Sequence, residues 1–153
     1  MLSATALAIG VLSTGLACGS GGGGHTPTTS GLPATVDIGK VRERIVRNWE
    51  TFFSGATPAS KKERLLQNGQ RYAKVLRQQS STPVAKRTSA HVSMVAVHGH
   101  RAAVRYSLLV SGQPMLANQT GMAVESGGTW KVSEKSFCAL LRVRGSAPPA
   151  CSK

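Results

Sequence analysis

The sequence predicts a single α+β domain in which about three N-terminal helices pack on an antiparallel sheet of four strands. Its 153 residues match the usual size of one domain, about 100 to 200 residues, and contain no internal repeat. Apolar residues recur at helical spacing in the first half of the folded region, residues 36–153, and alternate with polar residues in the second half. Helices followed by consecutive hairpins are typical of a sheet with its helices in a separate layer.

An uncharged, apolar segment opens the chain. Residues 1–17, MLSATALAIGVLSTGLA, contain no charged side chain and are shorter than the about 20 residues that cross a bilayer as a helix. This composition is typical of the hydrophobic segment of a signal peptide, although no Lys or Arg stands near Met1. The alternative, a short buried helix, would be followed by a glycine run that gives it nothing to pack against.

Cys18 follows this segment directly, in the sequence GLAC, which resembles the bacterial lipobox with Gly15 where an aliphatic residue is usual. In a lipobox the cysteine is diacylated and becomes the mature N-terminus, and two acyl chains give stable anchoring. We therefore predict a lipoprotein-type signal peptide at 1–17 and a lipidated Cys18. Residues 18–35 then form a flexible tether of Gly, Ser, Thr and Pro that holds the domain at the outer face of the membrane.

Two cysteines remain once Cys18 is lipidated. Cys138 and Cys151 lie in FCALLRVRGSAPPAC, and disulfides persist in exported proteins, so we predict a bond between them. The alternative is two unpaired buried thiols, but the segment SAPPA before Cys151 has no apolar pattern that would bury one. The chain has no C-x-x-C pair of the kind that binds zinc or works in redox exchange.

The first predicted helix lies in VDIGKVRERIVRNWETFFSG, where Asp37 is suited to the N-cap and Gly55 to the stop. Its apolar stripe at helical spacing consists of Val41, Ile45, Trp49, Phe52 and Phe53.

Two shorter helices are predicted next. In TPASKKERLLQNG, Ser60 and Glu63 form a capping box and Gly69 is suited to a left-handed C-cap. In QRYAKVLRQQ, the side chains that share one face are Tyr72, Val75, Leu76 and Gln79.

The four predicted strands are TSAHVSMVAV, RAAVRYSLLVSG, MLANQTGMAVE and TWKVS, with turns at HGH, QP and SGG. In the second strand the residues expected on one face are Ala102, Val104, Tyr106, Leu108 and Val110.

Several of these segments carry a family resemblance. NWETFFSGATPASKKERLLQNG, AAVRYSLLVSGQPMLANQTGMAVESGGTWKVSEKSFCALL and the Pro-rich end to Cys151 resemble the low-molecular-weight secreted antigen and lipoprotein family of mycobacteria and related actinobacteria. The resemblance implies an extracytoplasmic protein with no established enzymatic activity. It also implies a curved sheet in a cone similar to cystatin and nuclear transport factor 2 (NTF2). It brings no catalytic residues to transfer.

Catalytic and metal-binding patterns are absent from the sequence. Glu125 and Glu134 flank a predicted hairpin and are interpreted as ordinary edge charges. His98 and His100 flank Gly99 in a predicted turn, and two imidazoles do not complete a four-ligand zinc site. We therefore predict no catalytic residue, no metal and no cofactor.

The charge balance points to an anionic partner, because 19 Lys and Arg against 6 Asp and Glu give a net charge of +13. Export and the placement of the aromatic residues in apolar stripes argue against nucleic acid, which leaves anionic lipid, cell-wall polymer or an acidic envelope protein. The predicted contact residues are Lys61, Lys62, Arg64, Arg71, Lys74 and Arg77. A basic surface that only keeps the domain soluble is the alternative.

The sequence thus favours a membrane-anchored, non-enzymatic binding or accessory protein of the cell envelope. The alternatives are a purely structural envelope protein or a small cone-fold enzyme, such as an isomerase or cyclase. The aromatic residues predicted to line a pocket, with plain core packing as the other interpretation, are Trp49, Phe53, Tyr72, Tyr106 and Trp130.

Overall fold

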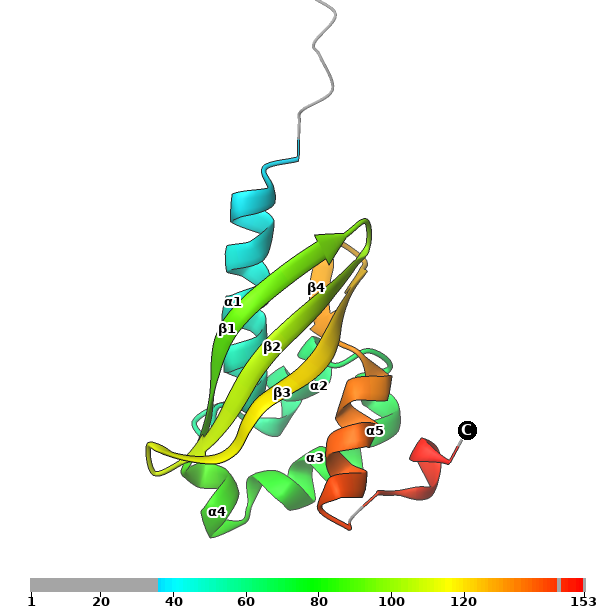
Figure 1. Ribbon diagram of the computed structural model, residues 1–153. Helices are drawn as coiled ribbons and strands as arrows, with labels where there is room; N and C mark the ends of the chain where they lie inside the picture. Colours follow the sequence, from blue (N-terminus) through cyan, green and yellow to red (C-terminus); the bar gives the residue numbers. More distant parts are fainter. Residues whose placement is uncertain (1–35, 146, 153) are drawn as a thin grey trace, which may run out of the picture. The chain divides into compact units, whose positions relative to one another are not determined.

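The computed structural model describes residues 36–145 and 147–152 (Figure 1). The predicted signal peptide, Cys18 and the tether lie outside the described residues. Helices come first in the chain: α1 (Ile38–Phe53), α2 (Ala59–Leu65), a 3-10 helix η1 (Gly69–Tyr72), α3 (Ala73–Ser80) and α4 (Pro83–Lys86). The strands follow as β1 (Thr88–His98), β2 (Arg101–Val110), β3 (Gln113–Ser126) and β4 (Thr129–Val132), and then α5 (Glu134–Val143) and η2 (Pro149–Cys151).

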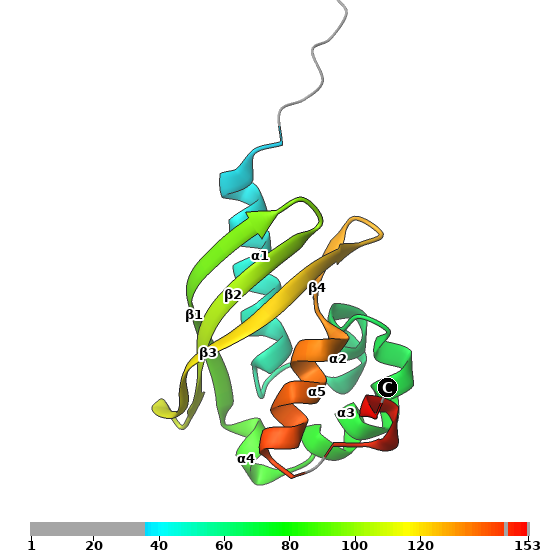
Figure 2. The same ribbon diagram turned by 45° about the vertical axis from the view of Figure 1, so that its right-hand side comes forward.

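The four strands form one antiparallel sheet in the order β1-β2-β3-β4, so the predicted α+β class is confirmed. On β2 the predicted inner residues Ala102, Val104, Tyr106 and Leu108 are buried. Irregular register between Val92 and Met94, and again in the β2–β3 pair, bends the ladder, because a bulge kinks the bulged strand. In Figures 1 and 2 the sheet curves around α1.

Helix α1 lies against the inner face of the sheet and contacts both edge strands, β1 and β4. The Asp37 side chain accepts a hydrogen bond from the Lys40 amide, as predicted for the N-cap. The predicted apolar stripe is buried in full, at Val41, Ile45, Trp49, Phe52 and Phe53. A hydrogen bond from Asn48 Nδ2 to the Trp130 carbonyl, 2.8 Å long, joins the helix to β4.

The remaining helices gather at the end of the sheet near the C-terminal end of α1 (Figure 2). The opposite face of the sheet, which carries exposed Met94 and Met122, has no helix over it in the part of the chain that the structure describes. Among the described residues no helix is long and apolar enough to cross a bilayer.

The predicted limits of α2 are wrong at both ends. The helix begins at Ala59 with Pro58 as N-cap, so Ser60 lies inside the first turn and forms no capping box. The left-handed residue is Asn68, with φ 54°, not Gly69. Gly69 is needed for another reason, because a Cβ there would lie 1.9 Å from the Glu63 carbonyl oxygen.

Two further corrections concern the second half. The β2–β3 turn is formed by Ser111 and Gly112, both with positive φ, while the predicted turn QP already belongs to β3. Helix α5 was not predicted, although the Ser133 side chain caps its start by accepting from the Ser136 amide. The predicted glycine turn holds, since Gly127 and Gly128 both have positive φ.

Candidate functional site

The structure does not bring the five predicted pocket aromatics into one cavity. Trp49, Phe53 and Tyr106 pack on one another, with the Trp49 and Tyr106 ring centres 5.1 Å apart and the Phe53 and Tyr106 rings stacked at 5.4 Å. Tyr72 and Trp130 line two separate hollows elsewhere. The three rings of Trp49, Phe53 and Tyr106 therefore fill the space between α1 and the inner face of the sheet.

A small apolar cavity lies at the end of the sheet where the helices gather. It has a volume of about 70 Å³ and is lined by side chains from α1, α2, α3, α4, β1, β2 and α5. The large apolar residues on its wall are Phe52, Phe53, Leu76, Leu108, Phe137, Leu140 and Leu141. Of the five aromatic residues predicted to line a pocket, only Phe53 lines this cavity.

Lys62 is the buried charge in this cavity wall. Its residue is 9% exposed, and no hydrogen bond or ion pair of its ammonium is found among the described residues, although the nitrogen itself keeps some contact with solvent. None of the six acidic residues of the chain lines the cavity. Burial lowers the pKa of Lys62, because an apolar surrounding disfavours the charged form. Most of the Lys62 side chain therefore faces this cavity, whereas the sequence predicts an exposed basic surface for it, shared with Lys61 and Arg64.

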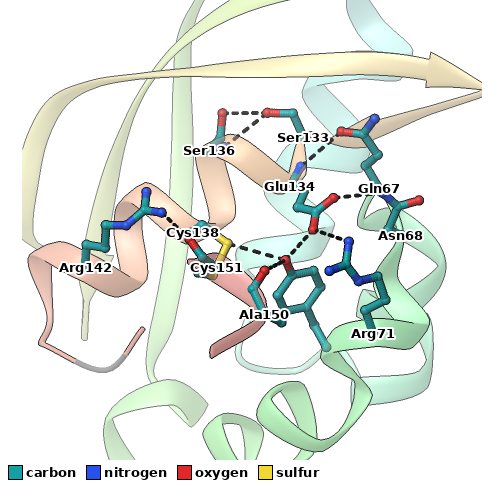
Figure 3. The surroundings of a disulfide bond; sticks show 11 residues. Gln67, Asn68, Arg71, Ser133, Glu134, Ser136, Cys138, Arg142, Ala150 and Cys151 are labelled. Atoms are coloured by element: carbon teal, nitrogen blue, oxygen red, sulfur yellow. Dashed lines mark hydrogen bonds and ion pairs between the residues drawn. A yellow bond between two sulfur atoms is a disulfide. The ribbon is translucent and has the colours of Figure 1, made fainter. Parts of the chain in front are cut away.

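A polar network surrounds the C-terminal disulfide (Figure 3). The predicted bond between Cys138 and Cys151 is present, and it ties η2 to α5 with a Cα–Cα distance of 5.4 Å. The Tyr72 hydroxyl lies 3.5 Å from Cys138 Sγ and donates to the Glu134 carboxylate at 2.5 Å. The Arg142 guanidinium donates to the Cys151 carbonyl and holds the last turn in place.

Glu134 is the centre of this network, and the sequence reasoning missed it. It receives hydrogen bonds from Asn68 at 2.7 Å, Arg71 at 3.0 Å and Tyr72, so the start of α5 is joined to η1. The signal that could have revealed this role is Ser133 as an N-cap, since an acidic residue after it would open a helix. Burial first, and then the hydrogen bond to Glu134, raise the pKa of Tyr72 to about 12.

Two of the predicted basic contact residues share a polar hollow. Arg64 and Arg71 line a hollow of about 410 Å³, together with Lys131 of β4, which the sequence reasoning did not include. Glu63 also lines it. Lys61, Lys74 and Arg77 are exposed, as expected for a basic surface.

His100, in the β1–β2 turn, pairs with a carboxylate of β3. His100 Nδ1 lies 2.8 Å from Glu125, and both line an apolar hollow of about 440 Å³ at the start of α1, beside Val36 and Trp130. Glu125 also accepts from the Gly128 amide, so it stabilises the β3–β4 hairpin. Within residues 36–145 and 147–152, no three side chains of the ligand types gather around a point.

Comparison with known proteins gives a family and several solved structures. The family described as "Low molecular weight antigen MTB12, C-terminal domain" matches residues 40–148. No curated protein matches the chain.

Three solved structures are similar to this chain. An M. tuberculosis LEH-like epoxide hydrolase is 15% identical, over 71% of this chain and 94% of its own, with a TM-score of 0.41. An NTF2-like protein of unknown function from Cytophaga hutchinsonii is 9% identical, over 67% and 91%, with a TM-score of 0.38. A substituted variant designated Rd1NTF2_05 is 13% identical, over 63% and 95%, with a TM-score of 0.45. At these scores no activity is transferred to this chain.

Proposed function

Because this chain belongs to the family of the low molecular weight antigen MTB12 C-terminal domain, we propose that it is an exported, lipid-anchored protein with a non-enzymatic binding or accessory role. The observation that carries the proposal is the disulfide between Cys138 and Cys151. Both cysteine residues are 4% exposed, and such a bond persists in an oxidising, extracytoplasmic compartment. The anchor is the diacylated Cys18, and the membrane it holds to is the outer face of the cell membrane.

The intact mass of the protein, expressed in a lipoprotein-processing bacterium, tests the proposed lipid anchor and the disulfide. We expect loss of residues 1–17, a diacylglycerol adduct on Cys18, and a gain of about 2 Da on reduction as two thiols form. A Cys18→Ala variant is the matched control, and it should keep the reduction shift but lose the adduct. A wild-type mass without the adduct would contradict the anchor, and one without the reduction shift would contradict the oxidised state.

The basic surface on α2, η1 and α3 supports an anionic partner for the exported domain. Reversing Lys61, Arg64 and Arg77 to Glu should weaken binding to vesicles of anionic lipid in a salt-dependent manner, because exposed charges are screened by ions. The control changes three other exposed basic residues to Glu, namely Arg42, Arg44 and Arg101. Equal loss in both variants would show attraction by net charge alone and contradict a specific surface.

The enzymatic alternative has one observation in its favour, the 2.5 Å hydrogen bond between Tyr72 and Glu134 beside a hollow of about 450 Å³. A general acid or base needs a free approach to substrate. Here the carboxylate is occupied by Asn68, Arg71 and Tyr72, and Tyr72 is 0% exposed. A structural role, in which these side chains connect η1 to α5, explains the arrangement without any catalytic step. We therefore place the binding role first.

A further inference from the structure

We propose that the cavity around Lys62 binds a small monocarboxylate, with the carboxylate paired to the Lys62 ammonium and a short apolar body against Phe52, Phe53 and Leu76. This inference deepens the proposed binding role and rests on it. It does not depend on the anchor at Cys18.

The first argument is the missing counter-charge. Taking a lysine ammonium out of water is unfavourable unless an anion or a set of acceptors compensates it. The Lys62 residue is 9% exposed, and within the described part of the chain its ammonium pairs with no anion or acceptor. The nitrogen keeps some contact with solvent, since it is not among the fully buried polar atoms, so the ammonium is partly rather than wholly dehydrated. Four of the six acidic residues are paired elsewhere: Asp37 with Lys40, Glu43 with Arg47, Glu125 with His100 and Glu134 with Arg71. Glu50 accepts from the Val92 amide, and Glu63 lines a different hollow.

The second argument is the chemistry of the wall. Apart from Lys62 and Arg144, which line it from α2 and from the residue after α5, the cavity wall carries no charge. Neutral polar residues, Gln79 and Ser80, line it as well and offer donors besides the ammonium, whereas the Thr88 hydroxyl already donates to the Val84 carbonyl. The rest is aromatic and aliphatic. A ligand that fits must be anionic at one end and apolar at the other.

The third argument is size. A buried water needs about 10–15 Å³ of accessible volume, so about 70 Å³ holds about five waters. A ligand of about six or seven non-hydrogen atoms fills such a space. Isovalerate has this size and a branched apolar body. The cavity is open on one side, so a longer acyl chain would extend out of it.

Calorimetric titration of the folded protein with isovalerate tests the proposal, and isovaleramide is the matched neutral probe. We expect isovalerate to bind about tenfold more tightly than isovaleramide, because only the acid pairs with the ammonium. Affinity for isovalerate should fall as the pH rises through the pKa of Lys62, since the neutral amine offers no charge. Equal binding of acid and amide, or no binding of either, would overturn the proposal.

Two lysine variants localise the effect. Lys62→Met removes the ammonium but keeps an unbranched apolar stem, and we expect it to lose about tenfold in affinity for isovalerate while still binding isovaleramide. Retained amide binding also shows that the variant is folded. Lys61→Met makes the same change of charge at an exposed neighbour and should leave the affinity unchanged. An equal loss in both variants would overturn the site.

A series of acids tests the size assignment. Acetate, isovalerate, octanoate and palmitate differ in apolar length but share the carboxylate. We expect the affinity to be highest at isovalerate. A continued rise to palmitate would overturn the small-ligand assignment and indicate a lipid acid whose chain lies outside the cavity.

Discussion

Gly121 on β3 lies so close to Trp49 on α1 that a single methyl group should destabilise the domain. A Cβ at position 121 would lie 2.6 Å from Trp49 Cη2 and 2.8 Å from Cζ2. Carbon atoms in contact prefer about 3.5–4.0 Å, so the ring would have to move by about 1 Å. Trp49 is 1% exposed and packs on Phe53 and Tyr106, so it has no free space to enter.

The expected cost of Gly121→Ala follows from this contact. Overpacking a filled core destabilises a protein by about 1–3 kcal/mol. Replacing glycine also reduces the conformational entropy of the unfolded chain, which offsets about 0.4–1 kcal/mol of this loss. The free energy of unfolding should therefore fall by about 1–2 kcal/mol. Urea denaturation followed by far-ultraviolet circular dichroism measures this value without depending on tryptophan fluorescence.

A second variant identifies the cause. Trp49→Phe removes the ring atoms that the new methyl group would meet, together with the indole N–H, which has no hydrogen-bond partner among the described residues. In the Trp49→Phe background, Gly121→Ala should cost at least about 1 kcal/mol less than in the wild type, because neighbouring sites couple. An equal cost in both backgrounds, or a Gly121→Ala protein as stable as the wild type, would refute the reasoning.

Other predictions concern the disulfide and the tyrosines. Replacing Cys138 and Cys151 together by Ala should lower the free energy of unfolding by about 3 kcal/mol and make it insensitive to reductant, since the bond joins residues 13 positions apart. A variant as stable as the oxidised wild type would contradict this. In a Tyr106→Phe background Tyr72 is the one tyrosine left, and tyrosinate absorbance should give its pKa as about 12. Glu134→Gln should lower this pKa but leave it above 10, because burial is the larger cause of the shift. An unchanged pKa would exclude the carboxylate as a cause. Both tyrosines have a raised pKa of about 12, so the folded state holds these protons more tightly, and stability should fall as the pH rises from about 10 toward about 12. Tyr72→Phe should reduce that loss in urea denaturation at each pH, and an identical pH profile would argue against it.

The sequence predicted the parts of the fold that follow from periodicity. The stripe from Val41 to Phe53 and the inner face of β2 are buried as expected, because a long amphipathic pattern fits one orientation only. Local signals failed where tertiary contacts decide. Gly69 was interpreted as a left-handed cap, but the backbone of Glu63 approaches it so closely that only glycine fits.

The site was less predictable, because it depends on side-chain direction. Lys62 lies next to Lys61 in a run of basic residues, and the packing of α2 shows that one side chain points inward and the other outward. Glu134 follows a predicted hairpin, and its role depends on Tyr72, which is 62 positions away. The spacing of Lys62 from Leu65 and Leu66, three and four positions, is a signal that could have placed it on the apolar face of α2, whereas the contact between Glu134 and Tyr72 leaves no pattern in the sequence.

The placement of α1 between both edges of the sheet also governs the order in which the chain can fold. A ribosome adds about 5–20 residues per second, so Trp130 is made about 4–16 s after Asn48, its hydrogen-bond partner 82 positions earlier. The hairpins of the sheet close within microseconds once their strands exist. The helix that contacts β1 and β4 is therefore the first of the described elements to be synthesised, and its contact with β4 must wait for most of the domain. Until β4 is available, the stripe of Val, Ile, Trp and Phe side chains on α1 lacks part of its cover, and in an exported chain this cover forms only after translocation.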